Sequence, residues 1–125
     1  MKELIKTFKA LSDETRLRIL NVLTERECCV CEVMQALEIS QTRASRNLSS
    51  LYDAGFLKVR RDGLWVLYSI DIENRTLEYQ DLIEIVRKAL KSNSITKTDK
   101  RRLRTAKRVG PDKVCTETTK AGLVL

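Results

Sequence analysis

A switch in hydrophobic periodicity at Gly55 limits the folds open to this chain more than any other feature. Before Gly55, apolar residues recur every three or four positions, as on helices, and through residues 56–70 they follow a period of two. Two strand-like runs there flank the pair Asp62-Gly63, which tolerates the positive φ of a tight hairpin turn. The sequence therefore predicts a group of helices followed by a β-hairpin.

Helical spacing predicts four helices before the hairpin and one after it. We expect them at about 4–11, 13–24, 29–37, 41–54 and 75–91. Ser12 and Ser40 are the expected N-caps of the second and fourth helices, and Gly55 is expected to end the fourth in a left-handed conformation. The apolar face of the fifth helix is wider than one small domain needs.

Length and composition favour a single small binding module. The chain has 125 residues, 42% of them hydrophobic but only 5% aromatic, so a core is feasible whereas a large enclosed pocket is difficult to line. It contains no histidine, glycine-rich phosphate loop or nucleophile motif. Cys28 and Cys31 have the spacing of a thiol oxidoreductase but follow a charged link rather than a strand. We expect no enzyme.

No apolar run approaches the roughly 20 residues that span a bilayer, so we expect a cytoplasmic protein without a membrane partner. The positive charge is concentrated at one end. Residues 1–91 hold fifteen Lys and Arg against fourteen Asp and Glu, whereas residues 92–125 hold nine against three. We interpret 1–91 as a DNA-binding and dimerisation domain and 92–125 as a basic, flexible tail.

Two short helices joined by a tight turn and followed by a basic hairpin fit a winged helix-turn-helix, a mainly α fold with a β-hairpin wing. The second helix of such a pair enters the major groove of DNA, and the hairpin approaches the minor groove or phosphates. The expected DNA-binding residues are Gln41, Thr42, Arg43, Ser45, Arg46 and Ser49 on the helix, with Lys58, Arg60 and Arg61 on the hairpin.

Blander interpretations exist for both sets. The polar face of the helix is also what an ordinary solvent-exposed helix presents. However, residues 41–51 contain no Asp or Glu, and a surface that faces phosphates requires this absence, which favours DNA binding. The hairpin cations also suit charge protection of an edge strand, and Asp62 weakens the DNA interpretation. A module that binds only protein remains an alternative, distinguished by DNA binding without steep salt dependence.

Several blocks of sequence resemble the ArsR/SmtB family of metal-responsive repressors. They are FKALSDETRLRIL at residues 8–20, SQTRASRNL at 40–48 and LYDAGFL at 51–57, in order and at the family's spacing. The resemblance covers about residues 3–91. It implies a homodimer whose first and last helices pair across the two-fold axis, and a repressor of transcription that binds double-stranded operator DNA.

The cysteine cluster is the candidate sensor. Thiols are expected to stay reduced in the cytoplasm, which leaves free thiolates or a metal site. Residues 27–33 resemble the family's arsenic- and antimony-sensing motif, with Cys29 and Cys31 at its first two positions and Met34 where a third cysteine is usual. The third thiolate therefore comes from elsewhere, with Cys28 and Cys115 as candidates.

Trivalent arsenic or antimony is the expected inducer, with cadmium or lead as the alternative, because soft thiolates bind soft ions. Reversible thiol oxidation is a further alternative, and a role as small buried side chains is another. On a regular helix Cys28 and Cys31 share a face, whereas Cys29 and Cys31 point nearly opposite ways. We therefore expect ligand capture to distort the start of this helix, shift the recognition helix and release DNA.

Overall fold

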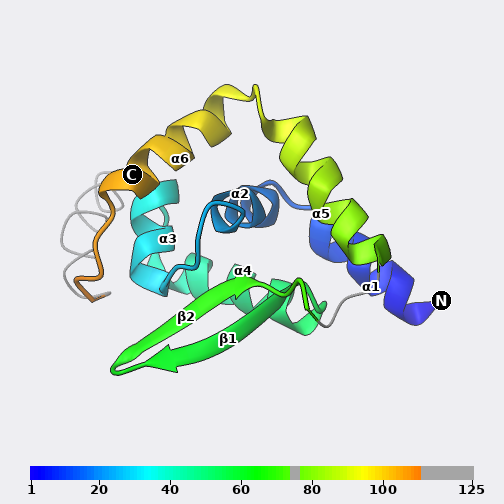
Figure 1. Cartoon of the computed structure of the whole chain (residues 1–125), viewed down its shortest axis with the longest axis horizontal. Coiled ribbons are helices and arrows are strands. Elements are labelled where there is room, and N and C mark those ends of the chain that lie inside the picture. The colour runs from blue at the N-terminus through cyan, green and yellow to red at the C-terminus, as the bar shows by residue number, and fades with distance from the viewer. Residues whose placement is uncertain (74–76, 111–125) are drawn as a thin grey trace.

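The computed structural model describes residues 1–73 and 77–110 of the chain. Its elements are α1 (Lys2–Leu11), α2 (Glu14–Leu23), α3 (Val30–Leu37), α4 (Gln41–Asp53), β1 (Leu57–Asp62), β2 (Trp65–Ile70), α5 (Leu77–Leu90) and α6 (Ser94–Thr105). Figure 1 shows helices around α2, with α4 and the hairpin along one side of the molecule. The predicted mainly α fold with a β-hairpin is confirmed. No helix of the described part has the length and apolar character that crossing a membrane requires.

The helix boundaries follow local capping. Ser40 caps α4 by accepting a hydrogen bond from the backbone N–H of Arg43 at 3.2 Å, as predicted. The predicted cap of α2 was wrong by one residue, because Asp13 has the extended backbone and accepts from the N–H of Arg16 at 3.0 Å. Ser12 instead bonds back to the last turn of α1. Gly55 has φ 90°, which confirms the left-handed end of α4.

The hairpin pairs β1 with β2 in an antiparallel register from Leu57 opposite Ile70 to Asp62 opposite Trp65. Asp62 is therefore the last strand residue, and the turn consists of Gly63 and Leu64 rather than the predicted Asp-Gly pair. Of the two turn residues only Gly63 has a positive φ, of 61°, which suits a two-residue turn with glycine at its first position.

The segment before α3 attaches to the hairpin. The backbone N–H of Cys28 donates to the carbonyl of Tyr68 at 3.0 Å, and the N–H of Tyr68 donates to the carbonyl of Cys28 at 2.8 Å. This isolated bridge fixes the chain just before α3 against β2.

One hydrophobic core lies between α2, α3, α4 and the inner side of the hairpin. The largest fully buried side chains are Phe56, Ile19, Leu20, Met34, Leu48, Leu51 and Leu67. Except for Ile19, they are apolar positions that the helical and strand periods marked; on α2 the sequence predicted Leu17 to face inward, whereas Ile19 is buried and Leu17 is half-buried. Burial of such side chains contributes about 1.5–3 kcal/mol each to folding, so this cluster orients α3 and α4 as a rigid pair.

Residues 94–105 correct the expectation of a flexible tail, because they form α6. Asn93 caps this helix by accepting from the N–H groups of Ile95 and Thr96. Asp99 and Leu103 are buried, and α6 packs against α2 and α3. The tail interpretation of residues 111–125 lies outside the described residues. A folded C-terminal helix therefore extends the domain beyond residue 91.

Apolar side chains on α1 and α5 are exposed in the single chain. α1 and α5 touch through a 2.9 Å hydrogen bond between the hydroxyls of Thr7 and Tyr79. The exposed apolar residues of the two helices are Leu4, Ile5, Phe8 and Ile85. These helices are the ones for which the sequence predicted pairing with a second copy.

Candidate nucleic-acid interface and thiol site

The outer face of α4 presents the predicted helix residues. α3 ends at Leu37, and the left-handed backbone of its C-cap, Glu38 (φ 56°), turns the chain tightly toward α4. Most of the predicted contact residues are exposed and Ser45 is half-buried; the exposed ones are Gln41, Thr42, Arg43, Arg46 and Ser49. With no carboxylate on it from Gln41 to Leu51, this surface suits an anionic partner.

Two arginines tie α4 to α2. Arg16 donates to the carbonyl of Ala10 at 2.6 Å and to the side chain of Asn47 at 3.3 Å. Arg43 donates to the hydroxyl of Thr15 at 2.8 Å, so its guanidinium rests on the start of α2. Sequence analysis missed the positioning role of Arg16 because nothing local in the sequence tells which distant acceptors a long side chain reaches.

The three predicted hairpin cations are all exposed, but they differ in their partners. Arg60 forms a two-pronged ion pair with Glu27, in which the Nε–Oε2 distance is 2.9 Å. The hydrogen bond from Arg60 lowers the pKa of Glu27. Lys58 lies 3.9 Å from Glu73, and Arg61 has no carboxylate partner within residues 1–73 and 77–110. Arg61 is therefore the hairpin cation most available to phosphate.

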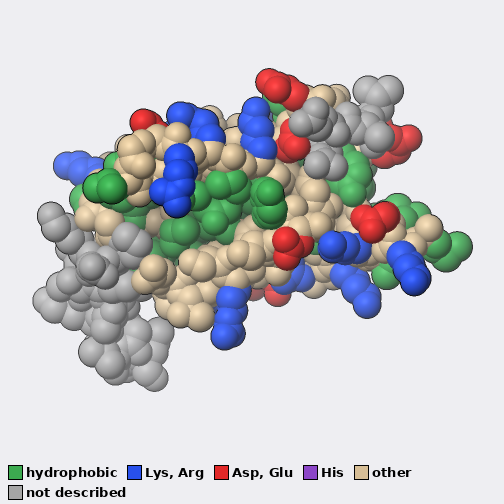
Figure 2. All heavy atoms as spheres, turned by 90° about the horizontal axis from the view of Figure 1, so that it is seen from below, with side chains coloured by type: hydrophobic (Ala, Val, Ile, Leu, Met, Phe, Trp, Pro, Cys, Tyr) green, Lys and Arg blue, Asp and Glu red, His purple; other side chains and the backbone are tan. Residues whose placement is uncertain are grey.

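Figure 2 views the molecule from below, the side on which α4 and the hairpin lie in Figure 1. Blue Lys and Arg side chains are scattered across this face around a central apolar area, with some acidic side chains between them. The surface is thus mixed in charge, and the acid-free stretch of α4 is its distinguishing part.

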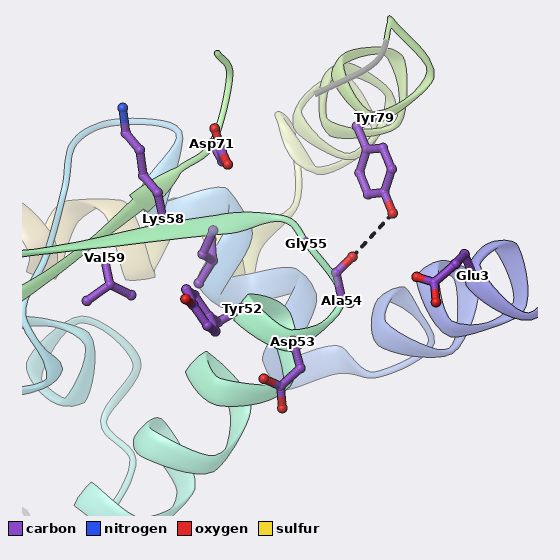
Figure 3. Close-up of a pocket in the computed structure, with 10 residues that line it drawn as sticks. Glu3, Tyr52, Asp53, Ala54, Gly55, Lys58, Val59, Asp71 and Tyr79 are labelled. Atoms are coloured by element: carbon purple, nitrogen blue, oxygen red, sulfur yellow. Dashed lines mark hydrogen bonds between the residues drawn. The ribbon is translucent and has the colours of Figure 1, made fainter. Parts of the chain in front are cut away.

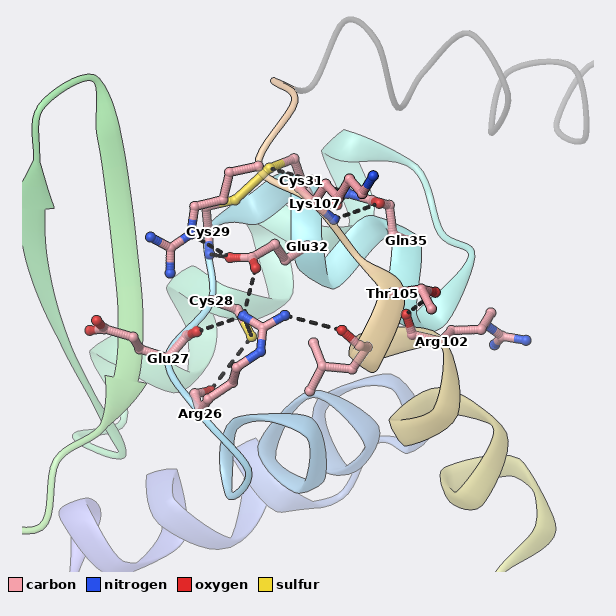
Figure 4. A network of polar contacts seen from close by, with 12 residues as sticks. Arg26, Glu27, Cys28, Cys29, Cys31, Glu32, Gln35, Arg102, Thr105 and Lys107 are labelled. Atoms are coloured by element: carbon pink, nitrogen blue, oxygen red, sulfur yellow. Dashed lines mark hydrogen bonds and ion pairs between the residues drawn. A yellow bond between two sulfur atoms is a disulfide. The ribbon is translucent and has the colours of Figure 1, made fainter.

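The thiol site lies at the start of α3. Cys29 is the N-cap of the helix, with extended φ −83° and ψ 170°, and Cys31 is in its first turn. Their sulfurs meet in a disulfide (Figure 4). The prediction that they point opposite ways was wrong, because the helix begins at Val30 and Cys29 does not follow helical geometry. The pair needs no unwinding to converge.

Cys28 is placed apart from this pair. Its thiol is fully buried and lies 3.5 Å from the carbonyl of Arg26, and burial raises its pKa to about 12. In Figure 4 it lies on the other side of the Glu32 carboxylate from the disulfide. Over the described residues, no three His, Cys, Asp or Glu side chains gather as a metal site. Cys115 lies outside the described residues.

Glu32 is a buried carboxylate at the centre of the site that sequence analysis did not select. It accepts from the backbone N–H of Cys29 at 3.0 Å and from Arg108 at 3.0 Å, and it forms an ion pair with Arg26. Burial alone raises the pKa of Glu32, but the Cys29 N–H and the two arginines outweigh it, so the pKa is lowered. The carboxylate thus remains charged and holds the cysteine cap in place.

We expect Glu32→Gln to destabilise the fold by about 3 kcal/mol, because it leaves two arginines beside a neutral partner in a buried site. Folding lowers the pKa of Glu32. The contribution of the ionised carboxylate to the free energy of unfolding is therefore complete above the ordinary glutamate pKa of about 4.3, and it is lost as the pH falls through the pKa of Glu32 in the folded protein. Urea unfolding of the two proteins at pH 7 and pH 3 checks both statements. An equal loss at both pH values contradicts them.

An open hollow of about 560 Å³ lies between α1, the end of α4, β1 and α5. Figure 3 shows Glu3, Asp53 and Asp71 among its labelled side chains, with Tyr79 donating to the carbonyl of Ala54 at 3.3 Å. None of its lining residues is a cysteine, so it is separate from the thiol site.

Two short helices joined by a tight turn, with a basic hairpin after them, define a winged helix-turn-helix protein. The model of the bacterial regulatory proteins of the arsR family matches residues 13–59. The chain is 36% identical over 83 residues to the arsenical resistance operon repressor of Bacillus subtilis, covering 65% of this chain and 79% of that protein. The chain belongs to the arsR family.

Two further proteins place it within this family. The arsenic resistance transcriptional regulator ArsR1 of Pseudomonas putida is 49% identical over 67 residues, 53% of this chain and 52% of its own length. For several curated relatives of this kind, the matched part of the chain spans only between about half and three fifths of the relative's length. The solution structure of the homodimeric winged helix-turn-helix DNA-binding domain Mb0332 of Mycobacterium bovis, a possible ArsR-family transcriptional regulator, is 27% identical with a TM-score of 0.62. The match covers 74% of this chain and 82% of that one.

Proposed function

We propose that this chain is a homodimeric transcriptional repressor whose affinity for operator DNA falls when trivalent arsenic or antimony binds the thiolates of Cys29 and Cys31. The observation that carries the proposal is the position of these cysteines. They cap and begin α3, which leads through a tight turn into the recognition helix α4. A change of geometry at the thiols therefore acts on the element that positions α4.

The DNA-binding part rests on surface chemistry. Arg46 and Gln41 extend from the acid-free face of α4, where arginine bonds guanine and glutamine bonds adenine in a bidentate manner. Arg61 is the hairpin cation most free to reach a phosphate, whereas Arg60 is engaged by Glu27. The exposed apolar residues of α1 and α5 provide the face that a second copy covers, which gives two recognition helices for a two-fold operator.

The choice of ion rests on the sulfur donors. Soft thiolates select thiophilic ions, and the absence of histidine leaves sulfur as the main soft donor. Cys28 is a poor third ligand because its thiol is fully buried beside the carbonyl of Arg26 and lies on the other side of Glu32 from the pair (Figure 4). Cys115, the remaining cysteine of the sequence, lies outside the described residues. We therefore favour Cys115 as the third thiolate, with cadmium or lead as the alternative ions.

The disulfide supports a second candidate, a repressor that responds to oxidation. The thiols of two cysteines with Cα atoms 5.5 Å apart transfer two protons and two electrons to hydrogen peroxide, which forms the disulfide and two molecules of water. This candidate uses the same residues and the same route to α4. It differs in requiring an oxidant instead of an ion, and a reductant restores DNA binding.

Fluorescence anisotropy with duplex DNA from upstream of the chain's own gene tests the proposal. The reduced protein is expected to bind with steep salt dependence and to be released by arsenite or antimonite at stoichiometric occupancy. Cadmium, zinc and peroxide are the comparison arms. Release by peroxide alone, reversed by a reductant and without arsenite uptake, supports the redox candidate. Sequence-independent binding, or none, contradicts the repressor.

We expect Arg46→Ala to weaken operator binding about 10- to 100-fold, since one good base contact is worth about 1–3 kcal/mol. Lys97→Ala is the matched control, because it removes one exposed positive charge from α6 rather than from α4. The same anisotropy titration measures both. Equal losses in the two variants contradict a specific contact at Arg46.

A further inference from the structure

The two thiol-site cysteines are closed off from solvent. Cys29 is 3% exposed and Cys31 is 1% exposed, although the start of a helix at the edge of a small domain is usually accessible. An ion or an oxidant cannot reach sulfurs covered to this degree unless some part of the chain moves. The identity of the cover therefore decides how the site is reached.

The segment that follows α6 lies against Cys31. The carbonyl oxygen of Lys107 lies 3.9 Å from the sulfur of Cys31. The side chain of Gln35 holds this residue twice, because its amide donates to the Lys107 carbonyl at 2.7 Å and its oxygen accepts from the Lys107 N–H at 3.1 Å. Figure 4 shows Lys107 beside Cys31 and Gln35. We call residues 106–108 the strap.

A third attachment joins the strap to the helix cap. Arg108 donates to one oxygen of Glu32 at 3.0 Å, and the same carboxylate accepts from the N–H of Cys29 at 3.0 Å. The other Glu32 oxygen binds Arg26, which also donates to the carbonyl of Leu103 in α6 at 3.1 Å. The strap is thus fixed to the residues that hold the thiol pair.

We propose that the strap is the gate of the thiol site, and that Gln35 and Arg108 set the inducer concentration at which the protein responds. This inference rests on the proposed function. If the thiols bind an ion only when the strap is open, the apparent dissociation constant equals the intrinsic one divided by the open fraction. Contacts that close the strap raise the concentration needed, and their loss lowers it. Neither residue lies on the acid-free face of α4 or on the hairpin.

The test compares Arg108→Ala and Gln35→Ala with Arg104→Ala, which removes an exposed arginine from the same part of the chain. The proteins are kept reduced with a phosphine, and the rate at which iodoacetamide alkylates Cys29 and Cys31 is followed by mass spectrometry. We expect both strap variants to react at least about tenfold faster than the wild type, because Arg108→Ala loses one hydrogen bond of the strap and Gln35→Ala loses two, and one bond of about 1.4 kcal/mol corresponds to a factor of ten. The Arg104 variant is expected to match the wild type.

The second readout is the arsenite concentration that releases half of the operator DNA. We expect it to fall by the same factor in the strap variants, with operator affinity before arsenite changed less than about twofold. Unchanged alkylation rates overturn the gate. Faster alkylation with no release of DNA from any of the proteins leaves the gate standing and overturns arsenite sensing, so the two failures are distinguishable.

Discussion

Replacing Cys29 and Cys31 together by serine is expected to leave operator affinity within about twofold of the wild type and to abolish release by arsenite. In the wild type we expect a fall in affinity of about 5- to 150-fold, the usual range for coupled sites. The reason is that these two side chains lie at the start of α3 without forming part of the acid-free face of α4. Anisotropy titrations with and without arsenite measure the effect.

Cys28→Ala and Cys115→Ser are the companion variants. Cys28 is buried on the other side of Glu32, so Cys28→Ala is expected to keep the arsenite response. Cys115→Ser is expected to weaken it, because a two-thiolate site binds the ion less tightly than a three-thiolate site. A double serine variant that still releases DNA on arsenite contradicts the proposed sensor. A lost response in the Cys28 variant assigns the third ligand to Cys28.

The second large effect concerns the attachment of α6. Asp99 is completely buried and accepts from Arg18 at 2.8 and 2.9 Å and from Arg102 at 3.2 Å. Its hydrogen bond raises the pKa of Arg18. Asp99→Ala is expected to cost about 3 kcal/mol of the free energy of unfolding, because it leaves two arginines without their buried partner.

Urea unfolding of Asp99→Ala measures this loss, with Lys97→Ala as the control on the exposed side of the same helix. Proteolysis within α6 is expected to become faster in the Asp99 variant and to stay unchanged in the control, because α6 detaches before the core opens. A loss below about 1 kcal/mol, with α6 still protected, contradicts a structural role for this ion pair.

The hydrophobic period predicted most of the fold, and its failure at α6 has a physical cause. α2, α3 and α4 bury apolar stripes, and α1 and α5 carry apolar residues on exposed faces. The sequence displays both patterns directly. α6 has few apolar side chains to bury, Leu103 among them. It is held by Asp99, which pairs with Arg102 on the same helix and with Arg18, 81 positions earlier in the chain. A charged segment that docks through ion pairs has the composition of a solvated tail.

The thiol site was predicted in its residues but not in its geometry. Cys29 and Cys31 were selected from a family motif, and their convergence depends on where α3 begins. The cap falls at Cys29 because Glu32 reaches back to its N–H, an arrangement typical of capping boxes with other residues at the N-cap. Arg108 could not be connected with this site, since its partner lies 76 positions earlier in the chain.

The backbone bridge between Cys28 and Tyr68 connects the thiol site to the hairpin as well as to α3. Cys29 stands between this attachment to the hairpin and Val30, the first residue of α3. A displacement of one residue therefore reaches the hairpin and α3 together. If the hairpin and α4 contact DNA as proposed, they share this attachment point, and we expect them to keep or lose their register on the duplex as a unit. We therefore expect no stage of release in which the hairpin holds DNA after α4 has left it.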